Sequence, residues 1–182
     1  DRTGKPLLLA VGYYRPHPPM VAPQRYFDLY PYDKIRMPEV PTDDRNDIPE
    51  CAFEQQQSWF NFIPESDGRH YIQARYAAVS FVDAQVGMLL DALDANGMTG
   101  NTIVVFLGDQ GFHLGEHFHW HKTTLFEEGC HVPLLIAAPG FKTAGAKSPA
   151  LVELVDVYPT LSELLGLEMP HATPGRSLVP QP

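Results

Sequence analysis

The order of apolar and polar residues divides the chain into short strand-like runs, one long helical segment and long polar stretches. Residues 6–12 form a continuous apolar run that ends in glycine, and residues 102–107 and 132–138 form two more. Continuous apolar runs of this length are typical of strands that are buried on both faces of a parallel sheet. We therefore predict three core strands at these positions.

Apolar residues at helical spacing separate these strands. The clearest pattern begins near Ser66 or Asp67, either of which is a suitable N-cap, and ends near Ala95, two residues before Gly97. Shorter helices are predicted over residues 23–30, 123–128 and 151–165. Strands that alternate with helices indicate an α/β fold with a parallel or mixed sheet that is flanked by helices.

Residues 31–64 show no such periodicity. This stretch is polar and rich in proline, so we expect it to cross the surface as a long loop. The chain has 182 residues, of which 44% are hydrophobic, and this is enough for one sizeable core.

Charge and hydropathy argue against some classes of protein. A formal net charge of -9 argues against nucleic acid as a partner, because phosphate binding needs clustered lysine and arginine. No apolar run approaches the roughly twenty residues of a membrane span, so we expect no membrane span.

The first residues lack the pattern of a signal peptide. Cys51 and Cys130 lie far apart, without the spacing of a zinc site or a disulfide framework.

The segment after the strand at residues 102–107 carries the highest density of reactive side chains. In α/β proteins, ligands bind outside the carboxyl ends of strands, which is where this segment lies. Asp109 and Gln110 offer a carboxylate and an amide oxygen, which hard cations such as Ca²⁺ or Mg²⁺ accept. The alternative is an aspartate that caps the following turn beside a solvated glutamine.

Residues 113–117 match the H-x-x-E-H motif of inverted zinc proteases. That motif binds zinc from a helix, which places both histidines on one face. Gly111 and Gly115 flank a segment that follows a strand directly, so we expect no stable helix and disfavour zinc.

His17 follows the first predicted strand and lies between prolines that restrict its backbone. A rigid imidazole at the end of a strand suits a proton donor or an anion contact. The cluster at residues 119–122 (His119, Trp120, His121 and Lys122) can equally be an exposed loop.

Taken together, these segments resemble the type I sulfatases of the alkaline-phosphatase-like superfamily, and within them they look most like the iduronate-2-sulfatases and their bacterial relatives. The resemblance covers nearly the whole chain in ordered blocks. These blocks are residues 8–19, 76–87, 108–122 with 131–134, and 174–178.

The resemblance implies roles for individual residues. Asp109 and Gln110 would be ligands of an active-site Ca²⁺, although many relatives carry another residue at the second position. Lys122 would contact the sulfate and the leaving oxygen, and His17 would be the active-site histidine. Substrate-binding roles are further assigned to His113, His117 and Trp120, with packing roles as the alternative for each.

One departure from the family pattern is an absence. Sulfatases use a formylglycine made in a Cys/Ser-x-Pro-x-Arg motif, and this chain contains no such motif and no strand with paired aspartates. By resemblance, residues 1–170 are then the C-terminal part of a catalytic domain, and residues 171–182 are a linker to a further subdomain. We expect this chain alone to be inactive and to associate through an uncovered apolar face, with the missing N-terminal part as partner.

The leading hypothesis is part of a sulfuric ester hydrolase that acts on a sulfated carbohydrate and is periplasmic, secreted or lysosomal. The second is a phosphodiesterase or phosphonate hydrolase of the same superfamily, which shares fold and metal geometry. The third is a non-catalytic domain that binds sulfated glycans, for which Gln110 is the single hint.

Overall fold

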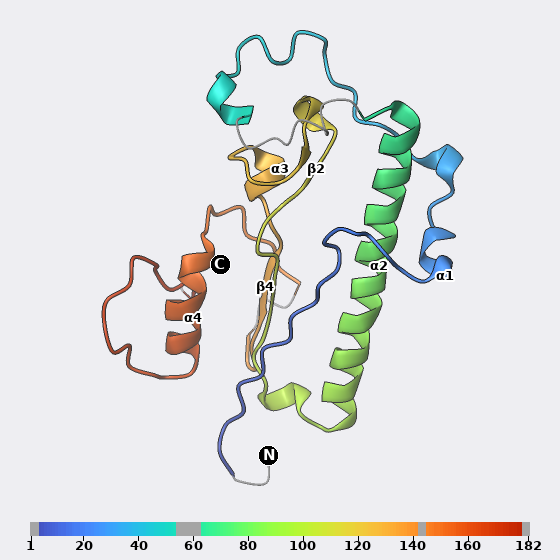
Figure 1. The fold of residues 1–182 in the computed structure, drawn as a ribbon. Coiled ribbons are helices and arrows are strands. Elements are labelled where there is room, and N and C mark those ends of the chain that lie inside the picture. The colour runs from blue at the N-terminus through green and yellow to red at the C-terminus, as the bar shows by residue number, and fades with distance from the viewer. Residues whose placement is uncertain (1–3, 54–62, 142–144, 180–182) are drawn as a thin grey trace.

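The computed structural model describes residues 4–53, 63–141 and 145–179. One long helix, α2 (Glu65–Ala95), runs along the molecule, and two small antiparallel sheets lie beside it (Figure 1). The other helical elements are short, with η marking a 3-10 helix: α1 (Gln24–Phe27), η1 (Tyr32–Lys34), η2 (Glu50–Phe53), η4 (Thr99–Asn101), η5 (Glu116–Phe118), α3 (Glu127–Cys130), η6 (Leu154–Asp156) and α4 (Val157–Leu164).

Helix α2 confirms the long helical pattern, with a different start. The helix begins at Glu65 after Pro64, and no side chain caps its first turn, so the expected capping by Ser66 or Asp67 is wrong. A proline suits this position because its fixed φ leads into the helix. At the other end, Gly97 has the expected left-handed φ of 64°.

The described strands pair antiparallel, which rules out a purely parallel sheet among them and leaves the expected mixed sheet open. Strand β1 (Val104–Leu107) pairs with β4 (Leu134–Ala137), with Leu107 opposite Leu134. The loop between them returns the chain to the edge that it left, and a parallel pair would need a crossover to the other end. Strands β2 (His113–Leu114) and β3 (Trp120–His121) form a second antiparallel pair within that loop.

Residues 6–12 do not form the predicted strand. They run in extended form beside β1 and β4 in Figure 1, without ladder hydrogen bonds to a described strand, and Leu8 is 90% exposed. An apolar run becomes a buried strand only when neighbours cover it, and the described residues supply no such neighbours. The other predicted helices are confirmed in part, as the short elements α1, α3 and α4.

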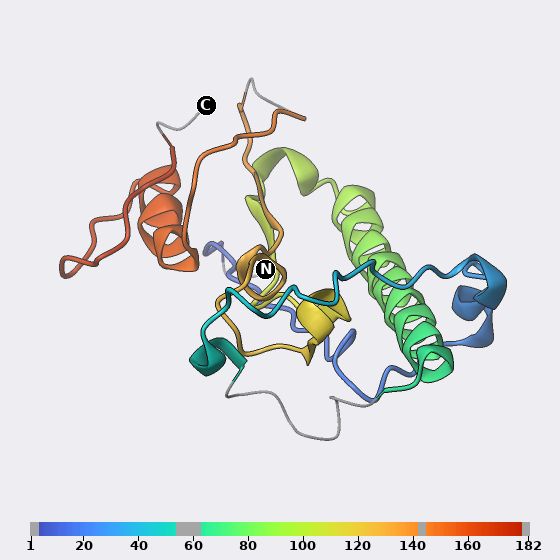
Figure 2. The ribbon, with the colours of Figure 1, turned by 90° about the horizontal axis from the view of Figure 1, so that it is seen from above.

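Figure 2 shows α1 on the outer side of α2, and α4 on the far side of the strands. Helix α1 and the turn after it are held to α2 by aromatic and hydrogen-bonding contacts. Tyr26 packs against Phe81 with ring centroids 5.4 Å apart, and the hydroxyls of Tyr30 and Ser80 lie 2.6 Å apart. The chain after His17 is thereby fixed along the first half of α2.

The buried core is small and lies between the first half of α2 and the β2–β3 pair. Ile35, Ile72 and Trp120 form its buried centre, and partly buried Tyr71 and Leu114 pack against them. The core therefore supports the segment after β1 that carries His113, His117 and Lys122.

Helix α2 is also long and apolar enough to cross a membrane by length and composition alone, with a mean hydropathy of 1.3 over its best window. This finding differs from the expectation that no segment meets that criterion. Core helices of proteins that never enter a membrane meet it too, and α2 carries Arg69 and Arg75, which donate to the carbonyls of Ile35 and Pro16. The helix is thus weak support for a membrane location.

The C-terminal segment is tied to α4 by Asp156. One oxygen of this buried carboxylate accepts from the backbone N–H of Glu153 at 2.9 Å, and the other accepts from that of Arg176 at 2.8 Å. Both hydrogen bonds lower the pKa of Asp156, and the one from the N–H of Glu153 has the larger effect. A Cβ at Gly175 would lie 2.2 Å from the carbonyl oxygen of Val155, so the close approach requires glycine.

Candidate active site

The loop after β1 is held in place by backbone hydrogen bonds on both sides of Asp109 and Gln110. The N–H of Gly108 donates to the carbonyl of Pro133 at 3.0 Å, and that of Gly111 to the carbonyl of Gly129 at 2.9 Å. Both side chains between these glycines are exposed. The structure therefore presents one carboxylate and one amide oxygen to solvent on a fixed backbone.

Gly111 permits this arrangement by its lack of a side chain. A Cβ here would lie 1.9 Å from the carbonyl oxygen of Glu128. The next residue, Phe112, donates its N–H to the same carbonyl at 2.6 Å. The loop and α3 thus approach each other more closely than any other residue would allow.

His113 and His119 form a buried pair below this loop. Both are 0% exposed, and their rings meet edge to face with centroids 4.5 Å apart. The Nε2 of His113 lies 2.8 Å from the hydroxyl of Thr124. Burial lowers the pKa of both rings, to about 4 for His119, where positive charge on His113 and Arg45 adds to the effect. Both imidazoles are therefore neutral at neutral pH.

His117 is tied to the polar loop before α2. Its Nδ1 lies 2.9 Å from a carboxylate oxygen of Asp44, and its ring stacks on Phe126 with centroids 4.6 Å apart. Arg45 donates to the carbonyls of His117 and Phe118, both at 2.9 Å. These contacts connect the reactive segment to a part of the chain about 70 residues earlier.

The segment with the H-x-x-E-H motif is not an α-helix, as the glycines predicted. His113 lies in β2, and His117 lies in the 3-10 helix η5 with a positive φ of 55°. Their ring nitrogens face Thr124 and Asp44, so the two rings do not converge as the zinc-protease motif requires. The parts of the chain that the structure describes contain no group of three metal-ligating side chains.

Trp120 belongs to the core. Its ring is 6% exposed and meets Tyr71 edge to face with centroids 5.6 Å apart. Cβ atoms at Gly68 and Gly115 would each lie 3.2 Å from the indole. In the described structure His113, His117 and Trp120 thus have packing partners, and their substrate-binding roles stay predictions.

Positive groups from three segments gather around His121. Burial lowers the pKa of His121, and positive charges on Lys122, His17 and Arg75 lower it further. Arg75 lies over Phe112, 4.3 Å from the ring centroid, and donates to the carbonyl of Pro16 at 2.7 Å. Arg75 of α2 thus contacts the N-terminal loop beside His17, and Phe112 lies between Arg75 and His121 of β3, with ring centroids 5.3 Å apart.

The backbone on each side of Lys122 has positive φ, 87° at His121 and 76° at Thr123. Residues other than glycine rarely adopt this conformation, which costs on the order of 1–3 kcal/mol where packing enforces it. Such conformations cluster at functional sites. Lys122 is half-buried between them.

His17 is exposed at the turn that closes with a hydrogen bond from its N–H to the carbonyl of Tyr14 at 3.0 Å. Its Nδ1 lies 2.7 Å from the carbonyl of Pro18. A carbonyl only accepts, so this contact places the proton of the neutral ring on Nδ1. The Nε2 atom then carries the lone pair.

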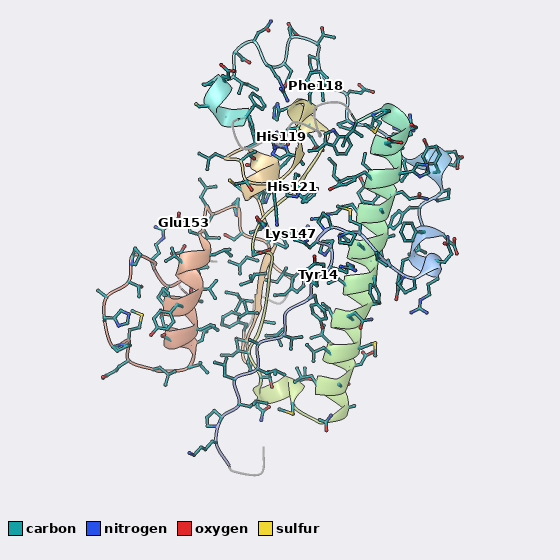
Figure 3. All side chains as sticks on the ribbon, viewed as in Figure 1. Tyr14, Phe118, His119, His121, Lys147 and Glu153 are labelled. Atoms are coloured by element: carbon teal, nitrogen blue, oxygen red, sulfur yellow. The ribbon has the colours of Figure 1, made fainter. Side chains whose placement is uncertain are left out.

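Sequence reasoning missed several residues that shape this site. Arg75 and Tyr71 lay inside a helical pattern, and Asp44 and Arg45 lay in an aperiodic stretch. Nothing in local periodicity marks a helix arginine that reaches a loop carbonyl 59 positions earlier. Figure 3 places His119 and His121 together around β3, above Tyr14 of the N-terminal segment.

Comparisons with known proteins bear on this arrangement. A relative named sulfatase from Formosa agariphila is 39% identical over 96% of this chain and 35% of its own length. Human iduronate 2-sulfatase is 34% identical over 94% of this chain and 38% of its own. The chain thus spans about a third of the length of these curated relatives.

Solved structures share the fold. A phosphonate monoester hydrolase from Silicibacter pomeroyi superposes with a TM-score of 0.80 and 29% identity, over 92% of this chain and 35% of its own. A protein in complex with its substrate D-glucosamine-2-N,6-O-disulfate superposes with a TM-score of 0.60 and 31% identity, over 82% of this chain and 30% of its own. The family model named Sulfatase matches residues 1–167. The chain belongs to the sulfatase family, whose fold is alkaline-phosphatase-like.

Proposed function

We propose that the polypeptide containing this chain hydrolyses sulfate esters of carbohydrates. Two observations carry the proposal: the chain is a member of the sulfatase family, and Arg75 connects the segments that bear His17 and Lys122. Arg75 donates to the carbonyl of Pro16, next to His17, and lies over Phe112, whose ring is 5.3 Å from that of His121, next to Lys122. Cleavage of a sulfate ester places negative charge on the bridging oxygen and the sulfate oxygens. Preorganised positive groups at that point stabilise this charge.

Two residues would act on the ester directly. The Lys122 ammonium neutralises charge on the sulfate and the leaving oxygen. His17 donates a proton from Nε2 to the leaving oxygen when its ring is protonated, while Nδ1–H to Pro18 keeps the ring oriented. The neutral His121 ring adds no charge beside Lys122.

Asp109 and Gln110 fit part of a Ca²⁺ site. Both side chains are exposed oxygen donors, and the flanking glycine hydrogen bonds fix their backbone. Ca²⁺ takes about six to eight oxygen ligands, so further ligands would come from outside this chain. When bound there, the ion would withdraw charge from a sulfate oxygen. A formylglycine nucleophile would likewise come from outside, because this sequence lacks its motif.

The same polypeptide would cover the exposed apolar residues of this chain. Leu7, Leu8 and Leu9 are each more than 60% exposed, next to the β1–β4 pair. Burial of such side chains stabilises by about 1.5–3 kcal/mol each, so an uncovered run favours association. The relatives are about three times as long as the chain, which leaves ample sequence to supply the cover.

A phosphonate ester is the second candidate substrate. The specific observation is the TM-score of 0.80 with a phosphonate monoester hydrolase. Phosphonate and sulfate esters both place negative charge at the reacting centre, so the same cationic groups serve either.

The test is sulfate release from glucosamine 6-sulfate by the full-length polypeptide with Ca²⁺, compared with hydrolysis of phenyl phenylphosphonate. Lys122→Ala is expected to lower kcat by about 100- to 1000-fold. Lys147→Ala, the same change at an exposed lysine, should leave kcat unchanged. No sulfate release by the wild type would overturn the proposal, and a preference for the phosphonate would establish the second candidate.

A further inference from the structure

We propose that Arg75 of α2 is a positioning residue that holds His17 in place as the proton donor to the leaving oxygen. This inference rests on the proposed function and goes beyond it, because it assigns a task to a helix residue outside the reacting groups. It is carried by two contacts of the Arg75 guanidinium, one with the loop at residues 13–21 and one with Phe112.

The first contact fixes the peptide bond that joins Pro16 to His17. The carbonyl of this peptide accepts a hydrogen bond from Nη1 of Arg75 at 2.7 Å, and its N–H donates to the carbonyl of Tyr14 at 3.0 Å. A peptide bond is planar, so hydrogen bonds at both of its polar groups set the orientation of the plane and the place of the His17 Cα. The hydrogen bond from Arg75 is the one with a charged donor, and such bonds are the stronger kind.

The loop does not reach its place against the helix by local contacts. Nδ1 of His17 lies 2.7 Å from the carbonyl of Pro18, a contact between adjacent residues that orients the ring only relative to its own loop. Arg75 reaches the loop from 59 positions away in the sequence. The Tyr13 hydroxyl also donates to α2, to the carbonyl of Gln85, at the longer distance of 3.4 Å. Arg75 is therefore the closer of these two connections, and it lies directly beside His17.

The second contact fixes the guanidinium itself. Its central carbon lies 4.3 Å from the ring centroid of Phe112, and Arg75 is half-buried, where a cation–π contact is stronger than on an exposed surface. Phe112 is fixed in turn, because it stacks on Tyr71 with centroids 6.2 Å apart and donates its N–H to the carbonyl of Glu128 at 2.6 Å. The loop after β1 thereby orients the arginine that holds His17.

Arg69 offers a matched control in the same helix. It is half-buried as well, and it also donates to a carbonyl that lies far away in the sequence, that of Ile35. Ile35 belongs to the buried core and not to the loop that carries His17. Loss of Arg69 therefore removes a similar hydrogen bond without moving His17.

The experiment is a double-mutant cycle on the hydrolysis of glucosamine 6-sulfate by the full-length polypeptide with Ca²⁺. Arg75→Met removes the charge and the donor, and it is expected to lower kcat about tenfold while KM changes by less than about threefold. A misplaced proton donor weakens the transition state more than it weakens substrate binding. After His17→Ala, the same change should lower kcat by less than about twofold, because the group that Arg75 holds is gone. Arg69→Met should leave kcat within about twofold in both backgrounds.

Three results would overturn the inference. A tenfold loss from Arg75→Met in both backgrounds would show that Arg75 acts through another group. An unchanged kcat would show that its hydrogen bond is not needed, and an equal loss from Arg69→Met would show general damage to α2. If Arg75→Met does not fold, Arg75→Lys replaces it, because lysine keeps the charge without the planar fork. Its expected loss is about threefold and must likewise vanish after His17→Ala.

Hydrogen exchange measures the positioning without any turnover. Residues 16, 18 and 19 are prolines without an N–H, so the amide of His17 dominates the exchange of a peptide over residues 14–19. This amide should exchange about tenfold faster or more after Arg75→Met, and at the wild-type rate after Arg69→Met. An unchanged rate after Arg75→Met would show that Arg75 does not hold this peptide. If the wild type hydrolyses no sulfate ester, the proposed function fails by itself, and the exchange rates still decide whether Arg75 positions His17.

Discussion

Two regions of the molecule are packed very differently, and the more apolar of the two is the less buried. The loop between β1 and β4 buries His113 and His119 completely, whereas the N-terminal run leaves Leu8 90% exposed. The loop is tied by hydrogen bonds to α3 and to the segment around Asp44. Hydrogen bonds to other described residues begin only after the N-terminal run, where the Tyr13 hydroxyl donates to the carbonyl of Gln85 and Arg75 donates to the carbonyl of Pro16.

The comparison distinguishes two kinds of residue. Residues of the loop are held by contacts within this chain, whereas residues of the N-terminal run need surfaces that the described residues do not supply. The candidate active-site loop has its core, its hydrogen-bond partners and its close glycine contacts within the chain. The apolar run has the composition of a core strand without the cover of one. Changes in the loop should therefore destabilise this chain strongly, and changes in the run should hardly do so.

The largest effect is expected for Gly111→Ala. Its Cβ would lie 1.9 Å from the carbonyl oxygen of Glu128, so the backbone must move and two loop hydrogen bonds must break. We expect a loss of about 4 kcal/mol in the free energy of unfolding, measured by denaturant titration. Gly100→Ala is the control, because nothing lies within 4 Å of a Cβ there. Similar losses for both variants would contradict the close contact.

Trp120→Ala should have the next largest effect. The ring is 6% exposed and forms the centre of the core with Ile35 and Ile72. Its removal is expected to cost about 3 kcal/mol, at the low end for a large aromatic residue because this core is small. Leu125→Ala in the same loop removes a side chain that is 96% exposed and should change stability by less than about 0.5 kcal/mol.

Acidification should weaken the loop through His119. Its pKa is about 4 in the folded state and near its ordinary value of 6.5 in the unfolded chain. The unfolded state therefore binds more protons between these values, so stability is full above pH 6.5 and falls as the pH drops towards 4. The loss amounts to about 3 kcal/mol at most. Denaturant titrations from pH 7 to 4 measure it, and His119→Gln should flatten the profile.

Leu8→Asp tests the uncovered region and should have the smallest effect on stability. Because Leu8 is already exposed, the free energy of unfolding of this chain should change by less than about 0.5 kcal/mol. The same change should reduce self-association in analytical ultracentrifugation, since a charge interrupts the apolar run. A loss above about 2 kcal/mol would show that the run is buried in this chain as well.

The sequence predicted most accurately the structural features that depend on residues close together along the chain. The long helix and its end at Gly97 follow from periodicity and a glycine stop, and both were found. The strand at residues 6–12 failed because strand formation depends on partners that local pattern does not reveal. The sequence assigned no partner to β1 or β4 for the same reason, and their pairing is antiparallel.

For the candidate site, the structure shows Asp109 and Gln110 exposed after β1, and the roles of these two residues, His17 and Lys122 stay predictions. The burial of His113 could not be foreseen, because its partner Thr124 becomes a neighbour only when the loop folds back. The contact of His117 with Asp44 joins positions 73 apart and has no local signal.

Asp156 has a consequence for the topology of the C-terminal segment. By joining the start of α4 to Arg176, 20 positions later, its carboxylate closes a loop around the helix. A disulfide that closes a loop also restricts the unfolded chain, whereas these hydrogen bonds to an ionised carboxylate exist only in the folded state. The closure is therefore lost when acid protonates Asp156, and it does not depend on redox conditions.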